Sequence, residues 1–189
     1  MVILGIDPGF TSLGWALLDF SNARPKCLGA GVIRTKVNPT MKKCDDNKRR
    51  IAWIARQLSM LERRYSFVLI AAEAQSWTRF QKADRAVAMA WGSIATLGEL
   101  WAVPILQFSP KEIKQTICND GSASKESVQN ELEANVDEAF NQLSKIRRTQ
   151  RNHAADALGA AYCAIGHDLC QMLVNVKAER LRSLGIGAE

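Results

Sequence analysis

The stretch that most constrains the fold is the beginning of the chain. An apolar, mostly β-branched run over residues 2–6 ends at Asp7, and Pro8 and Gly9 follow directly. Such a run suits a buried strand, while proline cannot donate a ladder hydrogen bond and glycine permits a tight turn. Residues 14–18 predict a second strand that pairs with the first as a hairpin. Asp7 is therefore expected at the end of a core strand, where a carboxylate is costly unless a cation accompanies it.

Three interpretations of Asp7 differ in function. A divalent metal that handles phosphate is the expected partner, and a surface aspartate in a turn is the simplest alternative. The third interpretation is a phosphate loop, because residues 7–11 fit the D-x-G-x-T pattern of actin-like ATPases and sugar kinases. Those proteins need two such lobes, and a chain of 189 residues is too short for both.

The composition indicates an ordinary globular protein with a polyanionic partner. A net charge of +6 and a pI of about 9.2 favour such a partner, and the length predicts one core-forming unit. The five cysteines form no C-x-x-C pair, which argues against a zinc site and a disulfide framework. We expect reduced thiols in an intracellular, cytoplasmic protein. The start of the chain does not have the pattern of a signal peptide, and no apolar stretch is long enough to span a bilayer, so no membrane partner is expected.

A second predicted core strand also ends in a carboxylate. Residues 66–72 form a continuous apolar run after its first serine, which is typical of a strand buried on both faces, and Glu73 follows. If this strand neighbours the first one in the sheet, both carboxylates emerge at the same edge. The pair then lies within reach of a bridging metal.

The segment after Glu73 interleaves aromatic and basic side chains. Aromatic rings can stack on bases while cations hold phosphates, and rings that only cap the core fit the pattern equally well. The candidates for contact with nucleic acid here are Trp77, Arg79, Phe80 and Lys82.

The middle of the chain alternates predicted strands and helices. Strands are expected over residues 28–35 and 104–108, a polar loop over 37–46, and helices over 48–64, 84–101, 111–118 and 125–135. The cations of helix 48–64, Arg50 among them, are predicted to form its solvated face. Helix 84–101 is rich in alanine and glycine, which allows close packing either on its own sheet or on a second subunit.

The third group of candidates follows a polar stretch over residues 137–151. This stretch ends in a basic cluster that includes Arg148 and Arg151, and an alanine-rich helix is predicted from residue 152. His153 and Asp156 are three residues apart and share one face of that helix. The small alanines allow the helix to press on the sheet and bring both side chains towards Asp7 and Glu73. A last amphipathic segment, residues 168–184, is expected to be peripheral.

This order of elements matches an α/β architecture, the ribonuclease H-like fold: a five-stranded mixed sheet with helices on both faces. The chain resembles the RuvC family of Holliday-junction resolvases. The resemblance rests on matching stretches that occur in the family's order across residues 3–165, namely Ile3–Gly9 with Gly14, Gly31–Lys36, the strand ending at Glu73, Lys114–Thr116, Gly121–Ala123 with Lys125, and Ala154–Leu158.

The resemblance implies a metal-dependent endonuclease that cuts four-way DNA junctions. The family's acidic metal-site positions fall on Asp7, Glu73, His153 and Asp156, with histidine at a position where many members have aspartate. They imply two Mg²⁺ ions per subunit, for which Mn²⁺ would substitute. The family's DNA-contacting lysines fall on Lys114 and Lys125, and its junction-entering aromatic on Trp77 or Phe80.

The resemblance also implies partners and a domain division. Two symmetric cuts imply a two-fold homodimer, expected through helix 84–101, and a branch-migration helicase is a possible partner. The nuclease domain is expected over residues 1–166, with a helical extension over 167–189. The alternatives are a nuclease of the same fold for other branched DNA or structured RNA, an actin-like ATP-binding lobe, and a DNA-binding module without catalysis.

Overall fold

The computed structural model describes residues 1–74 and 81–183, and the side chains of 1–74 and 85–176. Its centre is one sheet in the order β3-β2-β1-β4-β5. β1 pairs antiparallel with β2 and parallel with β4, which confirms the predicted five-stranded mixed sheet. The strands are β1 (Val2–Asp7), β2 (Ser12–Asp19), β3 (Lys26–Arg34), β4 (Leu69–Glu73) and β5 (Ile105–Phe108).

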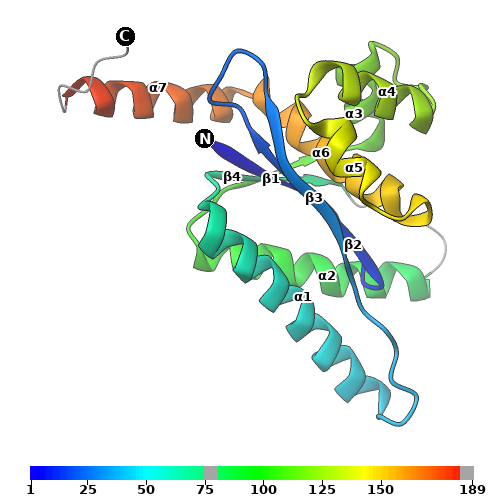
Figure 1. Cartoon of the computed structure of the whole chain (residues 1–189). Helices are drawn as coiled ribbons and strands as arrows, with labels where there is room; N and C mark the ends of the chain where they lie inside the picture. Colours follow the sequence, from blue (N-terminus) through cyan, green and yellow to red (C-terminus); the bar gives the residue numbers. More distant parts are fainter. Residues whose placement is uncertain (75–80, 184–189) are drawn as a thin grey trace.

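Helices cover both faces of the sheet, as predicted (Figure 1). One face carries α1 (Lys43–Tyr65) and α2 (Gln81–Leu100). The other carries α6 (Arg148–Ile165), with α3, α4 and α5 packed around it. These three helices span Pro110–Cys118, Lys125–Asn135 and Ala139–Ser144. The last helix, α7 (Asp168–Ser183), leads away from the sheet.

The central strand β1 contributes to two separate cores. Successive side chains of a strand point to opposite faces, so Leu4 and Ile6 pack under α1 and α2 while Ile3 packs under α6. All three side chains are fully buried. The strand is therefore fixed from both sides, and the residue at its end, Asp7, has a well-defined position.

Two glycines bring α6 unusually close to the sheet. A Cβ atom on Gly5 would lie 2.0 Å from the carbonyl oxygen of Ala157, and one on Gly14 would lie 2.0 Å from that of His153. No larger residue fits at either position without moving the helix. This close approach, which the alanine-rich sequence predicts, sets the first turns of α6 beside the end of β1.

The structure differs from the predicted elements in several places. Helix α6 begins at Arg148 rather than at residue 152, and strand β4 begins at Leu69 rather than at residue 66. Helix α1 begins at Lys43 rather than at residue 48, and Asp45 and Asp46 in its first turn favour that start because they face the positive end of the helix dipole. The predicted polar stretch 137–151 contains helix α5, which buries only Ala139 and Leu143. Two apolar residues are too few to give a helical pattern. Helix α3 begins with a capping box between Ser109 and Glu112.

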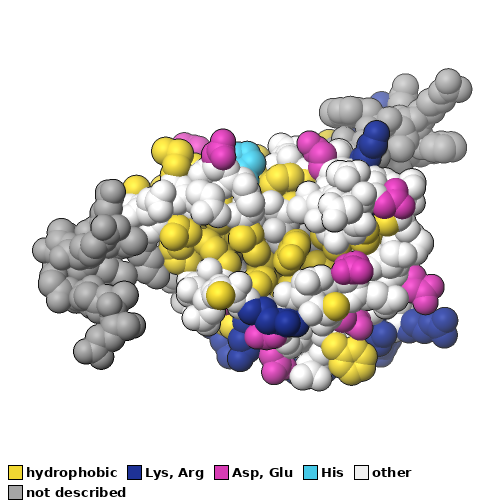
Figure 2. All heavy atoms as spheres, turned by 90° about the horizontal axis from the view of Figure 1, so that it is seen from above, with side chains coloured by type: hydrophobic (Ala, Val, Ile, Leu, Met, Phe, Trp, Pro, Cys, Tyr) yellow, Lys and Arg dark blue, Asp and Glu magenta, His cyan; other side chains and the backbone are white. Residues whose placement is uncertain are grey.

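Apolar side chains reach the surface in the centre of the face seen from above (Figure 2). Tyr162, Ile165 and Leu169 are among the partly buried residues that pack on the α6 core.

Of the described helices, none is by itself long and apolar enough to cross a membrane. Helix α6 and residues 168–176 taken together have the length and the apolar composition of a span, but the two segments are bent by 66° relative to each other. In this structure half of the α6 residues are buried, all of them between Ala154 and Ala164.

Candidate active site

Asp7 and Glu73 end neighbouring parallel strands. Ile6 of β1 pairs with Ala72 of β4, so the next residue of each strand is an acid at the same edge of the sheet. Each backbone is fixed by a buried strand, while the carboxylate beyond it is only partly covered. The structure therefore confirms the neighbourhood on which the sequence prediction depended.

Helix α6 adds two further polar side chains to this edge. The Nδ1 atom of His153 lies 2.6 Å from Oδ2 of Asp7. Asp156 follows on the same face of α6, and its Oδ2 accepts a 2.7 Å hydrogen bond from Nζ of Lys125 in α4. All four predicted metal-site residues are thus gathered at one edge, with Lys125 as an additional cation.

The proton affinities of these groups reflect their crowding. Burial, reinforced by the charges of Asp7 and Asp156, raises the pKa of Glu73 to about 7. Burial also raises the pKa of Asp156, against the opposing effect of Lys125. The hydrogen bond to Asp7 raises the pKa of His153. Each shift favours a bound proton, because the site concentrates negative charge in a partly desolvated place.

The donor set suits a divalent cation. In the described residues no three His, Cys, Asp or Glu side chains converge on one point as the ligands of an ion. Instead, Asp7 pairs with the imidazole of His153, and Asp156 pairs with the ammonium of Lys125. Each of these two carboxylates thus contacts a positive or proton-bearing group. Carboxylate oxygens are the ligands that Mg²⁺ prefers. A cation would also relieve the repulsion from Asp7 and Asp156, which adds to the effect of burial on the pKa of Glu73.

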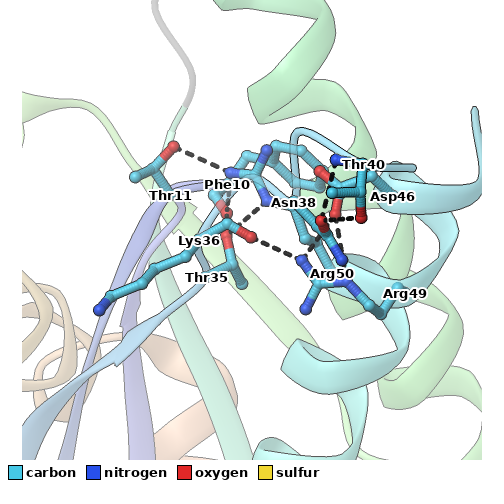
Figure 3. Close-up of polar contacts among 9 residues, drawn as sticks. All are labelled: Phe10, Thr11, Thr35, Lys36, Asn38, Thr40, Asp46, Arg49 and Arg50. Carbon is cyan, nitrogen blue, oxygen red and sulfur yellow. Dashed lines mark hydrogen bonds and ion pairs between the residues drawn. The ribbon is translucent and has the colours of Figure 1, made fainter. Parts of the chain in front are cut away.

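The turn after Asp7 is held by a buried arginine that the sequence prediction placed in solvent. Arg50 of α1 is only 5% exposed, and its guanidinium carbon lies 4.0 Å from the ring centroid of Phe10. Its Nε donates to the hydroxyl of Thr35 at 2.8 Å, and Nη2 donates to the hydroxyl of Thr11 at 3.0 Å (Figure 3). Arg50 thereby ties the β1–β2 turn to the end of β3. A helical arginine opposite two threonines at strand ends leaves no periodic signal in the sequence.

The two predicted DNA-contacting lysines share a pocket with the carboxylates. Lys114 and Lys125 line it together with Glu73 and Asp156, and apolar residues of α3 and α4 complete the wall. Two lysines and two carboxylates therefore line the same pocket.

The other predicted DNA contacts have different surroundings. Arg148 is exposed at the start of α6. Arg151 is partly buried, and its Nη2 donates to the backbone oxygen of Ser144 in α5. Of the aromatic segment, Trp77, Arg79 and Phe80 lie outside the described residues, as does the side chain of Lys82.

A mixed five-stranded sheet of this order, with carboxylates at the ends of two neighbouring strands, is the arrangement of the ribonuclease H-like class. The sequence model described as "Crossover junction endodeoxyribonuclease RuvC" matches residues 3–167. The chain belongs to this family, as the resemblance in its sequence predicts.

Individual relatives agree with the assignment. The crossover junction endodeoxyribonuclease RuvC of Prochlorococcus marinus strain MIT 9313 is 34% identical over 161 residues, which are 85% of this chain and 96% of the relative. The structure of Thermus thermophilus RuvC in complex with a Holliday junction substrate superimposes with a TM-score of 0.71 at 26% identity, covering 86% of this chain and 92% of the other. The yeast mitochondrial Holliday junction resolvase Ydc2 shares the fold, with a TM-score of 0.62 at 15% identity over 90% of this chain and 83% of the other.

Proposed function

We propose that this protein resolves four-way DNA junctions by paired, symmetric hydrolysis of phosphodiester bonds. The observation that carries the proposal is the gathering of three carboxylates and His153 at one sheet edge in a chain of the RuvC family. The complex of the T. thermophilus relative with a Holliday junction supports the substrate class. Family membership favours this activity over an actin-like ATP-binding lobe or a DNA-binding module without catalysis.

The metal-site residues would hold two divalent ions, Mg²⁺ or Mn²⁺, in each subunit. When bound, such a pair activates water for attack on phosphorus and neutralises charge on the leaving oxygen. Glu73 must lose its proton before it can serve as a ligand. His153 has Nδ1 engaged by Asp7, which leaves Nε2 as the nitrogen able to ligate an ion or orient a water. The proposed ligands are Asp7, Glu73, His153 and Asp156.

Two sets of residues would contact the junction. Lys114 and Lys125 would hold phosphate beside the carboxylates, because both line the pocket that contains Glu73 and Asp156. The basic residues Arg79, Lys82, Arg148 and Arg151 would add affinity for the arms. Trp77 or Phe80 would stack on bases at the open centre of the junction. Such stacking would distinguish a junction from linear duplex, because phosphate contacts form on both.

We further propose that the protein acts as a homodimer inside the cell. Two symmetric cuts require two sites in a fixed relation, and α2 would supply an isologous dimer contact. A branch-migration helicase would act on the same junctions. The extension after residue 166 would lie outside the nuclease domain, since the family model ends at residue 167. All five cysteines are free thiols, which supports a reducing, intracellular location.

The experiment is cleavage of an end-labelled synthetic four-way junction in Mg²⁺, beside linear duplex, a three-way flap and a structured RNA. We expect paired cuts in the junction alone and no product without a divalent ion. Equal cleavage of the flap or the RNA would instead assign another substrate to the same fold, and ATP-dependent binding without any cleavage would contradict the nuclease function.

A further inference from the structure

One ion pair at the site joins a DNA-contacting residue to a metal-site residue. Lys125 opens helix α4, and its Nζ lies 2.7 Å from Oδ2 of Asp156. The two partners differ in exposure, because the lysine side chain is 63% exposed and the aspartate side chain 22%. A flexible, largely exposed cation therefore covers a carboxylate that is mostly shielded from water.

The pair occupies the place that both expected ligands of the site require. A phosphate entering the pocket meets Lys114 and Lys125 in the same wall as Glu73 and Asp156. The ammonium of Lys125 carries a single positive charge, so its pairing with Asp156 weakens its attraction for a phosphate. A divalent cation on Asp156 would repel that same ammonium. Metal and DNA thus both favour the state in which the pair is broken.

The ion pair is also easy to break. Exposed lysine–carboxylate pairs contribute little net stability, since the charges recover solvation and the lysine recovers side-chain freedom when they part. Lys125 lies at the first turn of its helix, and Ser124 caps that helix through Ser127, so the cap does not depend on the lysine side chain. Exchange of the ammonium from Asp156 to a phosphate needs no change of backbone.

We propose that Lys125 exchanges between Asp156 and a DNA phosphate, and that this exchange couples metal binding to DNA binding. Without DNA, the lysine acts as a resident cation that competes with the metal for Asp156. A bound phosphate draws the lysine away and exposes the carboxylate to the metal. By linkage, DNA must strengthen metal binding by the same factor by which metal strengthens DNA binding. Lys125 is in this respect a positioning residue, and the inference rests on the proposed metal site.

The test measures binding and needs no activity. Mn²⁺ affinity of the full-length protein without DNA is measured by titration calorimetry for the wild type and for Lys125→Met, which keeps an unbranched apolar stem. Lys114→Met is the matched control, because that lysine lines the same pocket without an ion pair to a carboxylate among the described residues. Lys125→Arg keeps the charge and should behave as the wild type.

We expect Lys125→Met to bind Mn²⁺ about 3- to 10-fold more tightly and Lys114→Met to change this affinity less than twofold, as estimates from the loss of one weak, exposed ion pair. Junction affinity is also measured with and without Ca²⁺, and a gel verifies that the strands stay intact. The ratio of the two affinities should exceed one in the wild type and fall towards one in Lys125→Met. Unchanged or weaker Mn²⁺ binding by Lys125→Met would overturn the inference. Absence of Mn²⁺ binding by the wild type would instead contradict the proposed metal site itself.

Discussion

At the scale of single residues, a change at Asp7 can separate the loss of junction cleavage from the loss of junction binding. It ends a strand that is buried on both sides, and only its side chain reaches the site. Asp7→Asn keeps the shape and removes the charge that a cation needs. We expect junction cleavage to fall by at least a thousandfold, roughly the loss when a group central to catalysis is removed. Junction affinity in a gel-shift assay without metal should stay within a few-fold. Cleavage by this variant at near the wild-type rate would remove Asp7 from the metal site.

Glu73 gives the site a pH dependence with a defined sign. Its pKa is raised by burial and by Asp7 and Asp156 to about 7 in the folded state, against 4.5 as the ordinary value. The folded protein therefore binds this proton more tightly than the unfolded chain. The resulting stabilisation is complete below pH 4.5 and is lost as the pH rises through about 7. His153, whose pKa is also raised, acts in the same direction.

We therefore expect the metal-free protein to lose stability between pH 5 and pH 8, by about 1–2 kcal/mol from Glu73 after allowance for its partial exposure. Urea unfolding of the wild type and of Glu73→Gln at both pH values measures this, and the variant should show a smaller loss. Glu126→Gln is the control, because Glu126 is an exposed residue of α4. Identical pH profiles for the wild type and Glu73→Gln would contradict the raised pKa.

At the scale of elements, the Arg50 contacts join α1, the β1–β2 turn and the end of β3. Arg50→Met keeps much of the apolar volume but removes the donor to the buried hydroxyl of Thr35, which itself still donates to the backbone oxygen of Phe10. We expect a loss of about 1–3 kcal/mol in the free energy of unfolding, measured in urea. Arg56→Met on the same helix removes an exposed arginine whose one hydrogen bond within the described part of the chain is to the backbone oxygen of Ala52, and it should change stability by less than about 0.5 kcal/mol. Equal effects of the two variants would mean that the Arg50 contacts do not stabilise the fold.

The same residue shows where prediction from the sequence ends. The strands ending at Asp7 and Glu73 could be predicted because apolar runs report burial directly. The placement of His153 could be predicted because alanines around it permit close packing. The burial of Arg50 could not, since it depends on Thr11 and Thr35 meeting in three dimensions. The bond between Lys125 and Asp156 joins residues 31 apart in sequence and likewise leaves no local pattern.

At the scale of the whole molecule, two cuts in one junction require a dimer, and the outer face of α2 is the proposed contact. Its exposed positions Ala88, Gly92 and Ala95 carry little or no side chain. A Cβ atom on Gly92 would meet no atom of the described residues within 4 Å. In a monomer, replacing this helical glycine by alanine should therefore stabilise the fold by up to about 1 kcal/mol. In a dimer that packs two such faces closely, any larger side chain would hold them apart.

Gly92→Leu tests this contact directly. We expect the variant to remain folded but to elute as a monomer when its mass is measured by light scattering at micromolar concentration. On a plasmid with an extruded cruciform, it should produce single nicks instead of the paired cuts that linearise the plasmid, because the two active sites are no longer held together. Gly166→Leu is the matched control, since Gly166 is equally open but lies beyond α6. A dimer that survives Gly92→Leu with paired cutting intact would place the subunit contact elsewhere on the molecule.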